Sequence, residues 1–174
     1  MVKTLQVGPH STRRWRSVCG RYTVSIADGC LHKMVSLAQE YVPREIGTSL
    51  IGSYTPDGFD AVVLGIAPVP SDSKGQRGAF QRGVRGLKCF FRALFEASHG
   101  EKHYVGEWHS HPFGPCTPSP TDDANQNAIS NSSKTNCPES ILIILGGDLL
   151  RKPETSVFVY SRGRGRVNLL PEWQ

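Results

Sequence analysis

The feature that most limits how this chain can fold is the stretch EWHSHPFGPCTPSPTDD, residues 107–123. Its first half predicts the end of a strand, because Pro112 cannot donate to the hydrogen-bond ladder of a sheet. Its second half predicts the start of a helix. Ser119 is a favourable N-cap, a proline follows at the first helical position, and Asp122 sets a carboxylate near the positive end of the helix dipole. The stretch therefore predicts a strand, a turn and a helix in succession.

Further helices and strands are predicted around this unit. Apolar residues recur at helical spacing from about Cys30 to Tyr41, with Asp28 as the expected N-cap and Pro43 as the expected end. The expected strands cover residues 21–26, 48–54, 60–69, 103–111, 141–145 and 155–161, with helices also over about 78–98 and 120–132 and a turn or tail at 163–166. This alternation indicates an α/β or α+β domain, a sheet with helices packed against it.

The predicted helix over 78–98 has apolar residues on one side and basic residues on the other. We interpret the basic side as a solvated face of a core helix, and the alternative is a docking surface for an acidic partner. The basic residues are Arg77, Arg82, Arg85, Lys88 and Arg92.

Composition narrows the class of protein. The 174 residues suffice for one domain with a sizeable core, and 38% apolar and 20% charged residues suit a globular protein. Residues 1–17 are polar and basic and predict a flexible arm, which leaves 18–174 as a single domain. Five separated cysteines without a CxxC pair predict reduced thiols in a cytoplasmic protein. We expect no signal peptide, no membrane span and, despite a net charge of +5, no nucleic-acid partner.

The two histidines of the opening stretch predict a metal site. His109 and His111 are two residues apart, so on a strand both side chains point to the same face. Each imidazole can give zinc one nitrogen, at about 2.0–2.1 Å. Asp122 is the candidate third ligand, a role compatible with its place in the first helical turn, and Ser119 would then face the reacting carbonyl. Three protein ligands leave the fourth zinc position open, which is typical of catalytic sites.

His109-Ser110-His111-Pro112, followed by Ser119 and Asp122, resembles the signature of the JAMM metallopeptidases of the MPN domain superfamily. In that family the general base is a glutamate in an upstream segment of the form E-x-G-G-x-L-x-G. Residues 45–52, EIGTSLIG, match this form except for a threonine in place of the second glycine. The resemblance therefore makes Glu45 the base.

The resemblance covers about residues 20–165 and carries expectations about fold and chemistry. It implies an MPN domain, a cytidine-deaminase-like mixed β-sheet sandwiched by helices. It also implies a peptidase or isopeptidase with one zinc ion per chain. In such an enzyme the zinc and Ser119 polarise the scissile carbonyl, while Glu45 takes a proton from water and delivers it to the departing amine.

Other residues near the motif are candidates for related roles. Glu107 is two residues before His109, so it shares the face of the histidines on a regular strand and could orient an imidazole; the alternative is an ordinary strand residue. Cys116 could bind zinc, but an ordinary loop cysteine is the favoured interpretation. Trp108 should face away from the metal into the core, and Asp123 is expected to face solvent.

The GEWHSHP segment resembles the prokaryotic branch of the family, in particular the deconjugating peptidases of bacterial anti-phage operons. The implied substrate is the C-terminal tail, with its conjugates, of a ubiquitin-like protein or of a cGAS-like nucleotidyltransferase in a CBASS operon. An E1/E2-like ligase is the implied operon partner. The alternatives are a RadC-like JAMM hydrolase of unknown substrate, a non-catalytic MPN scaffold and, without a supporting motif, a nucleic-acid binder.

Overall fold

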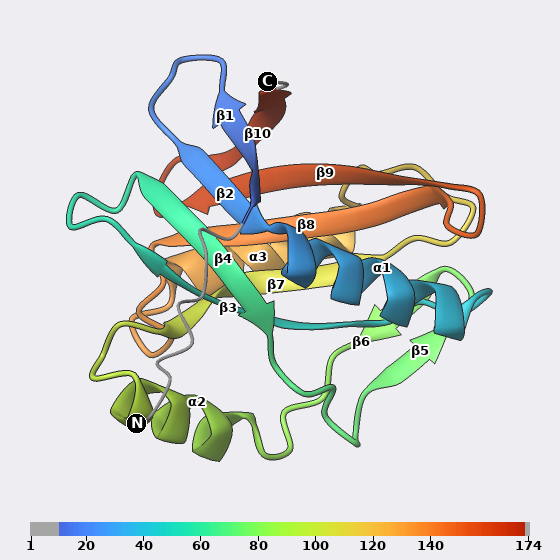
Figure 1. The fold of residues 1–174 in the computed structure, drawn as a ribbon, viewed down its shortest axis with the longest axis horizontal. Helices are drawn as coiled ribbons and strands as arrows, with labels where there is room; N and C mark the ends of the chain where they lie inside the picture. Colours follow the sequence, from blue (N-terminus) through green and yellow to red (C-terminus); the bar gives the residue numbers. More distant parts are fainter. Residues whose placement is uncertain (1–10, 173–174) are drawn as a thin grey trace, which may run out of the picture.

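The computed structural model describes residues 11–172, in which ten strands and three helices alternate (Figure 1). The elements are β1 (Thr12–Ser17), β2 (Thr23–Ala27), α1 (Asp28–Tyr41), β3 (Gly47–Tyr54), β4 (Asp60–Ile66), β5 (Lys74–Gln76), β6 (Ala79–Gln81), α2 (Leu87–Ala97), β7 (His103–Ser110), α3 (Pro120–Asn131), β8 (Glu139–Asp148), β9 (Lys152–Ser161) and β10 (Gly165–Glu172).

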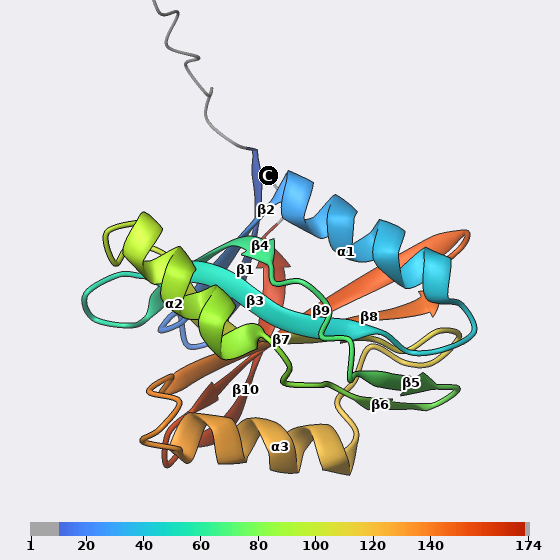
Figure 2. The same ribbon diagram turned by 90° about the horizontal axis from the view of Figure 1, so that it is seen from below.

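Eight of the strands close into a barrel in the order β1-β10-β9-β8-β7-β3-β4-β2. The β2–β4 and β7–β8 pairs are parallel and the other pairs are antiparallel. The helices lie outside the barrel, with α1 and α3 on opposite sides (Figure 2). The predicted mixed α+β content is confirmed. The closed barrel was not expected, and the finer prediction of a cytidine-deaminase-like sheet sandwiched by helices is not confirmed.

The short apolar run predicted as a buried strand forms the centre of β8. Ile141 and Ile143 point into the main core, which also contains Met34 of α1. Leu142 belongs instead to a second, smaller cluster with Phe158 of β9. Because α3 packs against β8 and β9, this strand is covered on both faces. That explains its continuous rather than alternating apolar pattern.

Three predictions about the ends of elements are wrong in whole or in part. Residues 1–10 of the predicted arm are outside the described part of the chain, but Thr12–Ser17 form β1, so the barrel begins before residue 18. Exposed arginines alternate there with the buried Trp15, and the charge hides the strand pattern. The expected turn or tail at 163–166 is a turn at 162–164, but 165–166 belong to β10 and not to a tail. Helix α1 is preceded by Ala27 as N-cap and begins at Asp28, whose side chain caps no amide.

The predicted helix over 78–98 is much shorter than expected. Only Leu87–Ala97 are helical, and β5 and β6 form a separate two-stranded hairpin before it. Gly86 precedes the helix with a φ of 82°, a left-handed conformation that favours glycine. Three of the five basic residues therefore lie outside the helix, and the prediction of one basic helical face is wrong. Arg82 is part of an ion pair rather than a solvated face.

None of the helices within residues 11–172 is long and apolar enough to cross a membrane.

Candidate metal centre

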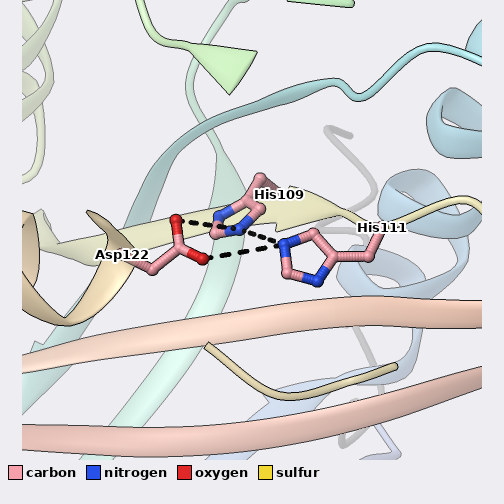
Figure 3. Close-up of side chains that lie close together, drawn as sticks. All are labelled: His109, His111 and Asp122. Carbon is pink, nitrogen blue, oxygen red and sulfur yellow. Dashed lines mark hydrogen bonds and ion pairs between the residues drawn. The ribbon is translucent and has the colours of Figure 1, made fainter. Parts of the chain in front are cut away.

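The structure brings the three predicted metal ligands together (Figure 3). His109 is near the end of β7, His111 follows that strand, and Asp122 is in the first turn of α3. Their nearest ligand atoms all lie within 4.8 Å of one another. The two Nε2 atoms are 2.9 Å apart. The carboxylate oxygens of Asp122 lie 3.4 Å from Nε2 of His109 and 3.7 Å from that of His111. Two imidazoles and one carboxylate therefore face a common point.

A hydrogen bond in the turn after β7 sets the orientation of His111. Its Nδ1 is 3.0 Å from the carbonyl oxygen of Pro115. Because a carbonyl only accepts hydrogen bonds, Nδ1 must carry the proton, and Nε2 presents its lone pair to the other two residues. Burial lowers the pKa of His111, and the neighbouring His109 lowers it further. The neutral imidazole that a metal ligand requires is thus favoured.

Asp122 combines the helix-capping role and the metal-facing position that the sequence predicted. The Ser119 amide and hydroxyl donate to Oδ2 of Asp122 at 2.8 and 2.7 Å, and the Asp122 amide donates back to Ser119 Oγ at 3.2 Å. This is a capping box. Burial alone raises the pKa of Asp122, but hydrogen bonds and charge from His109, with the Ser119 bonds, hold it well below its usual range. The carboxylate is therefore ionised and rigid.

The helix that carries Asp122 is held to the barrel largely by polar contacts. Asp123 accepts a hydrogen bond from Tyr160 Oη at 2.5 Å and forms an ion pair with Arg166 at 2.9 Å. Asp123 lies in the first turn of α3, as predicted, but its partly exposed side chain binds these two partners rather than solvent alone. One turn later, Ser140 of β8 donates to Gln126 Oε1 at 3.0 Å. These contacts fix α3 without a wide apolar face, and no sequence pattern indicated them.

Glu45 lies two residues before β3, and the next residue, Ile46, joins this segment to the metal strand through the serine between the two histidines. The Ile46 amide donates to Ser110 Oγ at 3.1 Å, and the Ser110 amide donates to the Ile46 carbonyl at 2.8 Å. Glu45 is buried and lines the same hollow as His111, Ser119 and Asp122. Burial raises its pKa, opposed by His109. The structure thus brings Glu45 to the predicted ligands from more than sixty residues away.

Gly47 allows β3 to approach the metal strand closely. It pairs with His109 in the β3–β7 ladder. A Cβ at Gly47 would lie 2.2 Å from the carbonyl oxygen of Trp108 and 2.7 Å from Cβ of His109. The first glycine of the EIGTSLIG segment is therefore required by close packing against a candidate ligand.

Glu107 is buried beside the site, but its direct partners are not histidines. Its carboxylate forms an ion pair with Arg82 at 2.8 Å and accepts hydrogen bonds from Tyr104 at 2.8 Å and Ser49 at 3.3 Å. Within residues 11–172, no hydrogen bond joins it to His109. A role in orienting an imidazole stays a prediction.

The two remaining neighbours of the motif behave as ordinary packing residues. Trp108 is buried in the main core on the face opposite the histidines, as predicted. Cys116 packs against Gly146, and burial raises the pKa of its thiol to about 11. It is not among the clustered ligand atoms.

Two hollows meet at the candidate ligands. One, of about 440 Å³, is lined by Glu45, Ser119 and the turn 111–118. The other, of about 510 Å³, runs along α3 beside Glu107 and His109. Phe80, Thr121 and Asp122 line both. The donor groups therefore lie where the two hollows adjoin.

Comparison with known proteins identifies the family. The Prok-JAB model, which describes prokaryotic homologs of the JAB domain, matches residues 28–160, and this range includes Glu45 and the three candidate ligands. The chain belongs to this family. It is 37% identical over 148 residues to a protein of Enterobacter hormaechei subsp. hoffmannii named CD-NTase/cGAS isopeptidase, covering 85% of this chain and 81% of that one.

A solved structure is similar to this prokaryotic JAB domain in fold. It is the solution structure of protein DSY2949 from Desulfitobacterium hafniense, with a TM-score of 0.54 and 19% sequence identity over 83% of this chain and 88% of that one. At this identity the likeness bears on the fold alone.

Proposed function

We propose that this prokaryotic JAB protein is a zinc-dependent isopeptidase that releases a cGAS-like nucleotidyltransferase from its conjugates in bacterial anti-phage defence. The observation that carries the proposal is the convergence of His109, His111 and Asp122 beside the buried Glu45, where two hollows meet. The name of the Enterobacter hormaechei relative supports this substrate over a ubiquitin-like modifier. The reaction then reverses the work of an E1/E2-like ligase.

The donor set fits one zinc ion. Two imidazole nitrogens and one carboxylate oxygen are the ligand types that zinc prefers, and three protein ligands are usual where zinc is catalytic. The hydrogen bond from His111 to Pro115 and the capping box around Asp122 give two of the ligands the outer support that metal sites need. Zinc bound there would acidify water and polarise the substrate carbonyl.

Glu45 and Ser119 supply the proton and hydrogen-bond chemistry in this proposal. The raised pKa of Glu45 makes it a stronger base than an exposed glutamate, so it takes the proton of the attacking water and passes it to the departing lysine amine. The Ser119 hydroxyl, which donates to Asp122 here, would turn to the oxyanion that develops on the carbonyl. No covalent intermediate with the protein is needed.

The two hollows suit the scissile bond of a conjugate, which has a polypeptide on each side. A scissile bond held at Asp122 would extend its acyl part into one hollow and its amine part into the other, because both hollows reach this residue. The adjoining β5–β6 hairpin offers a sheet edge beside which an extended tail could lie. A complete ligand set with a candidate base supports an enzyme over a non-catalytic MPN scaffold.

The decisive experiment compares Glu45→Gln with the unmodified protein. We expect Glu45→Gln to keep one zinc per chain by metal analysis, and to lose at least about 100-fold in kcat on a nucleotidyltransferase–lysine conjugate, because general acid–base catalysis contributes about 10²–10⁴-fold. The matched control is Glu40→Gln, an exposed glutamate at the end of α1, which should cleave normally.

Two results would count against the proposal. Near-normal turnover by Glu45→Gln would assign the base to another residue. Zinc-loaded wild-type protein that cleaves neither the nucleotidyltransferase conjugate nor a ubiquitin-like conjugate would exclude the isopeptidase role and favour the RadC-like alternative.

A further inference from the structure

The β5–β6 hairpin is separate from the barrel and borders the candidate site. On one side it contacts the segment of the proposed base, since the Glu45 amide donates to the Gln76 carbonyl at 3.0 Å. A Cβ at Gly75 would lie 2.1 Å from the carbonyl oxygen of Glu45, so the two backbones touch. On the other side, Phe80 of β6 lines both hollows. The position of this hairpin therefore shapes the junction where a substrate would bind.

The neck of the hairpin is closed within its own segment. Asp72 accepts hydrogen bonds from the amides of Val84 and Arg85 at 3.1 and 3.0 Å, and Ser73 accepts one from the Gly83 amide at 2.9 Å. These bonds join the two ends of the hairpin to each other. They do not join the hairpin to the barrel. The hydrogen bond from the Glu45 amide to the Gln76 carbonyl holds only the β5 side, so another contact must hold the β6 side over the site.

Arg82, the residue after β6, makes that contact. Its Nε lies 2.8 Å from Oε2 of Glu107 on β7, and the two side chains are 27% and 10% exposed. Tyr104 and Ser49 donate to the same carboxylate, which fixes its position. Removing one partner of a mostly buried ion pair leaves the other charge unpaired, so such a pair is strongly coupled. The Glu107 end of the pair is thus held in place on the barrel.

We propose that the Arg82–Glu107 ion pair is a positioning device, which holds Phe80 and the hairpin at the junction of the two hollows and so sets the grip on substrate. This proposal rests on the isopeptidase function proposed above. Arg82 touches none of the three candidate metal ligands in the ion pairs and hydrogen bonds of residues 11–172. Its effect is therefore carried by the hairpin rather than by the metal.

The test is a double-mutant cycle between Arg82→Met and Phe80→Ala in the full chain, with Arg85→Met as the matched control. Arg85 is a neighbouring exposed arginine outside the hollows. We expect Arg82→Met to raise KM for the conjugate about tenfold with kcat within about threefold of wild type, as misplaced binding groups do. Because both changes act on Phe80, the double variant should be no worse than the worse single variant. Arg82→Lys should recover part of the loss, since lysine keeps the charge but lacks the planar fork.

Two readouts do not depend on cleavage. Amide hydrogen exchange over residues 74–81 should become at least about tenfold faster in Arg82→Met and stay unchanged in Arg85→Met. Zinc affinity, measured by chelator competition, should change less than about twofold, because the ligands are not displaced.

Several outcomes would overturn the positioning role. These are additive KM effects in the cycle, unchanged hairpin exchange in Arg82→Met, or a large fall in zinc affinity, which would show that Arg82 acts through His109. If wild-type protein cleaves no conjugate while amide hydrogen exchange of the hairpin still rises in Arg82→Met, the proposed function fails and the positioning role of the Arg82–Glu107 ion pair is supported.

Discussion

Replacing Gly47 by alanine tests how closely the site depends on the packing of β3 against β7. The new methyl group would lie 2.2 Å from the carbonyl oxygen of Trp108, against about 3.4 Å for an ordinary contact. The strands must therefore separate by about 1 Å at the register position of His109. Such overpacking costs about 1–3 kcal/mol of folding stability. A 1 Å displacement near reacting groups costs about 100-fold in rate.

Two glycines provide matched controls for this variant. Gly52 is also on β3, and a Cβ there would lie 2.1 Å from the carbonyl oxygen of Val62, away from the candidate ligands. Gly65 on β4 has room, with its nearest neighbour 3.8 Å away. Both Gly47→Ala and Gly52→Ala should lower the free energy of unfolding in urea, and Gly65→Ala should not. Only Gly47→Ala should also lose zinc affinity and about 100-fold in kcat/KM.

The comparison of Gly47→Ala with Gly52→Ala is the decisive test of whether the β3–β7 contact positions His109. If Gly47→Ala binds zinc as tightly as Gly52→Ala at a similar loss of stability, then the β3–β7 contact does not position His109, and the account of this glycine is wrong.

Three further predictions concern the metal, the thiols and the anchor of α3. Zinc at about 1,000 times its Kd should stabilise the fold by about 4 kcal/mol, or roughly 8–16 °C in Tm for a chain of this size; calorimetry should show most of this shift lost in His109→Ala. At pH 8, a thiol reagent should modify only the exposed Cys19 and Cys89 in the folded protein, because burial raises the pKa of the other three thiols to about 11, and unfolding should release all five. Tyr160→Phe, which removes a hydrogen bond to the charged Asp123, should lower the free energy of unfolding in urea by about 1–3 kcal/mol.

The parts of the fold that follow local rules were predictable from the sequence. Helix α3 begins where the predicted Ser119 N-cap indicated, and β7 ends at the predicted proline-bounded turn. The convergence of His109, His111 and Asp122 followed from strand alternation and from one helix start. Glu45 was different, because only the resemblance of its segment to a family motif connected it with residues more than sixty positions later.

The parts that failed depend on contacts between distant residues. The sequence over 78–98 has apolar positions at helical spacing, so it predicted a helix, of which the first part is not helical in the structure. The neck bonds from Asp72 and the ion pair between Arg82 and Glu107 stabilise a hairpin there instead. Local propensity is a weak guide when such tertiary contacts compete with it. Closure of the barrel by β1 and β10 was hidden for a similar reason, because arginines on the solvent side obscure the strand pattern.

The serine between the two histidines shows how the site is built as one unit. Ser110 is fully buried and exchanges two hydrogen bonds with Ile46, the residue after the proposed base. In a strand, successive residues face opposite sides, so the residue between two ligands is turned away from the metal and is free to bind the neighbouring segment. The His-Ser-His segment therefore holds the ligands with its outer residues and the base segment with its middle one. A displacement of β3 relative to β7 would move the base away from the ligands. Gly47 lies at the same junction and has no room for a side chain, so any substitution there would cause such a displacement.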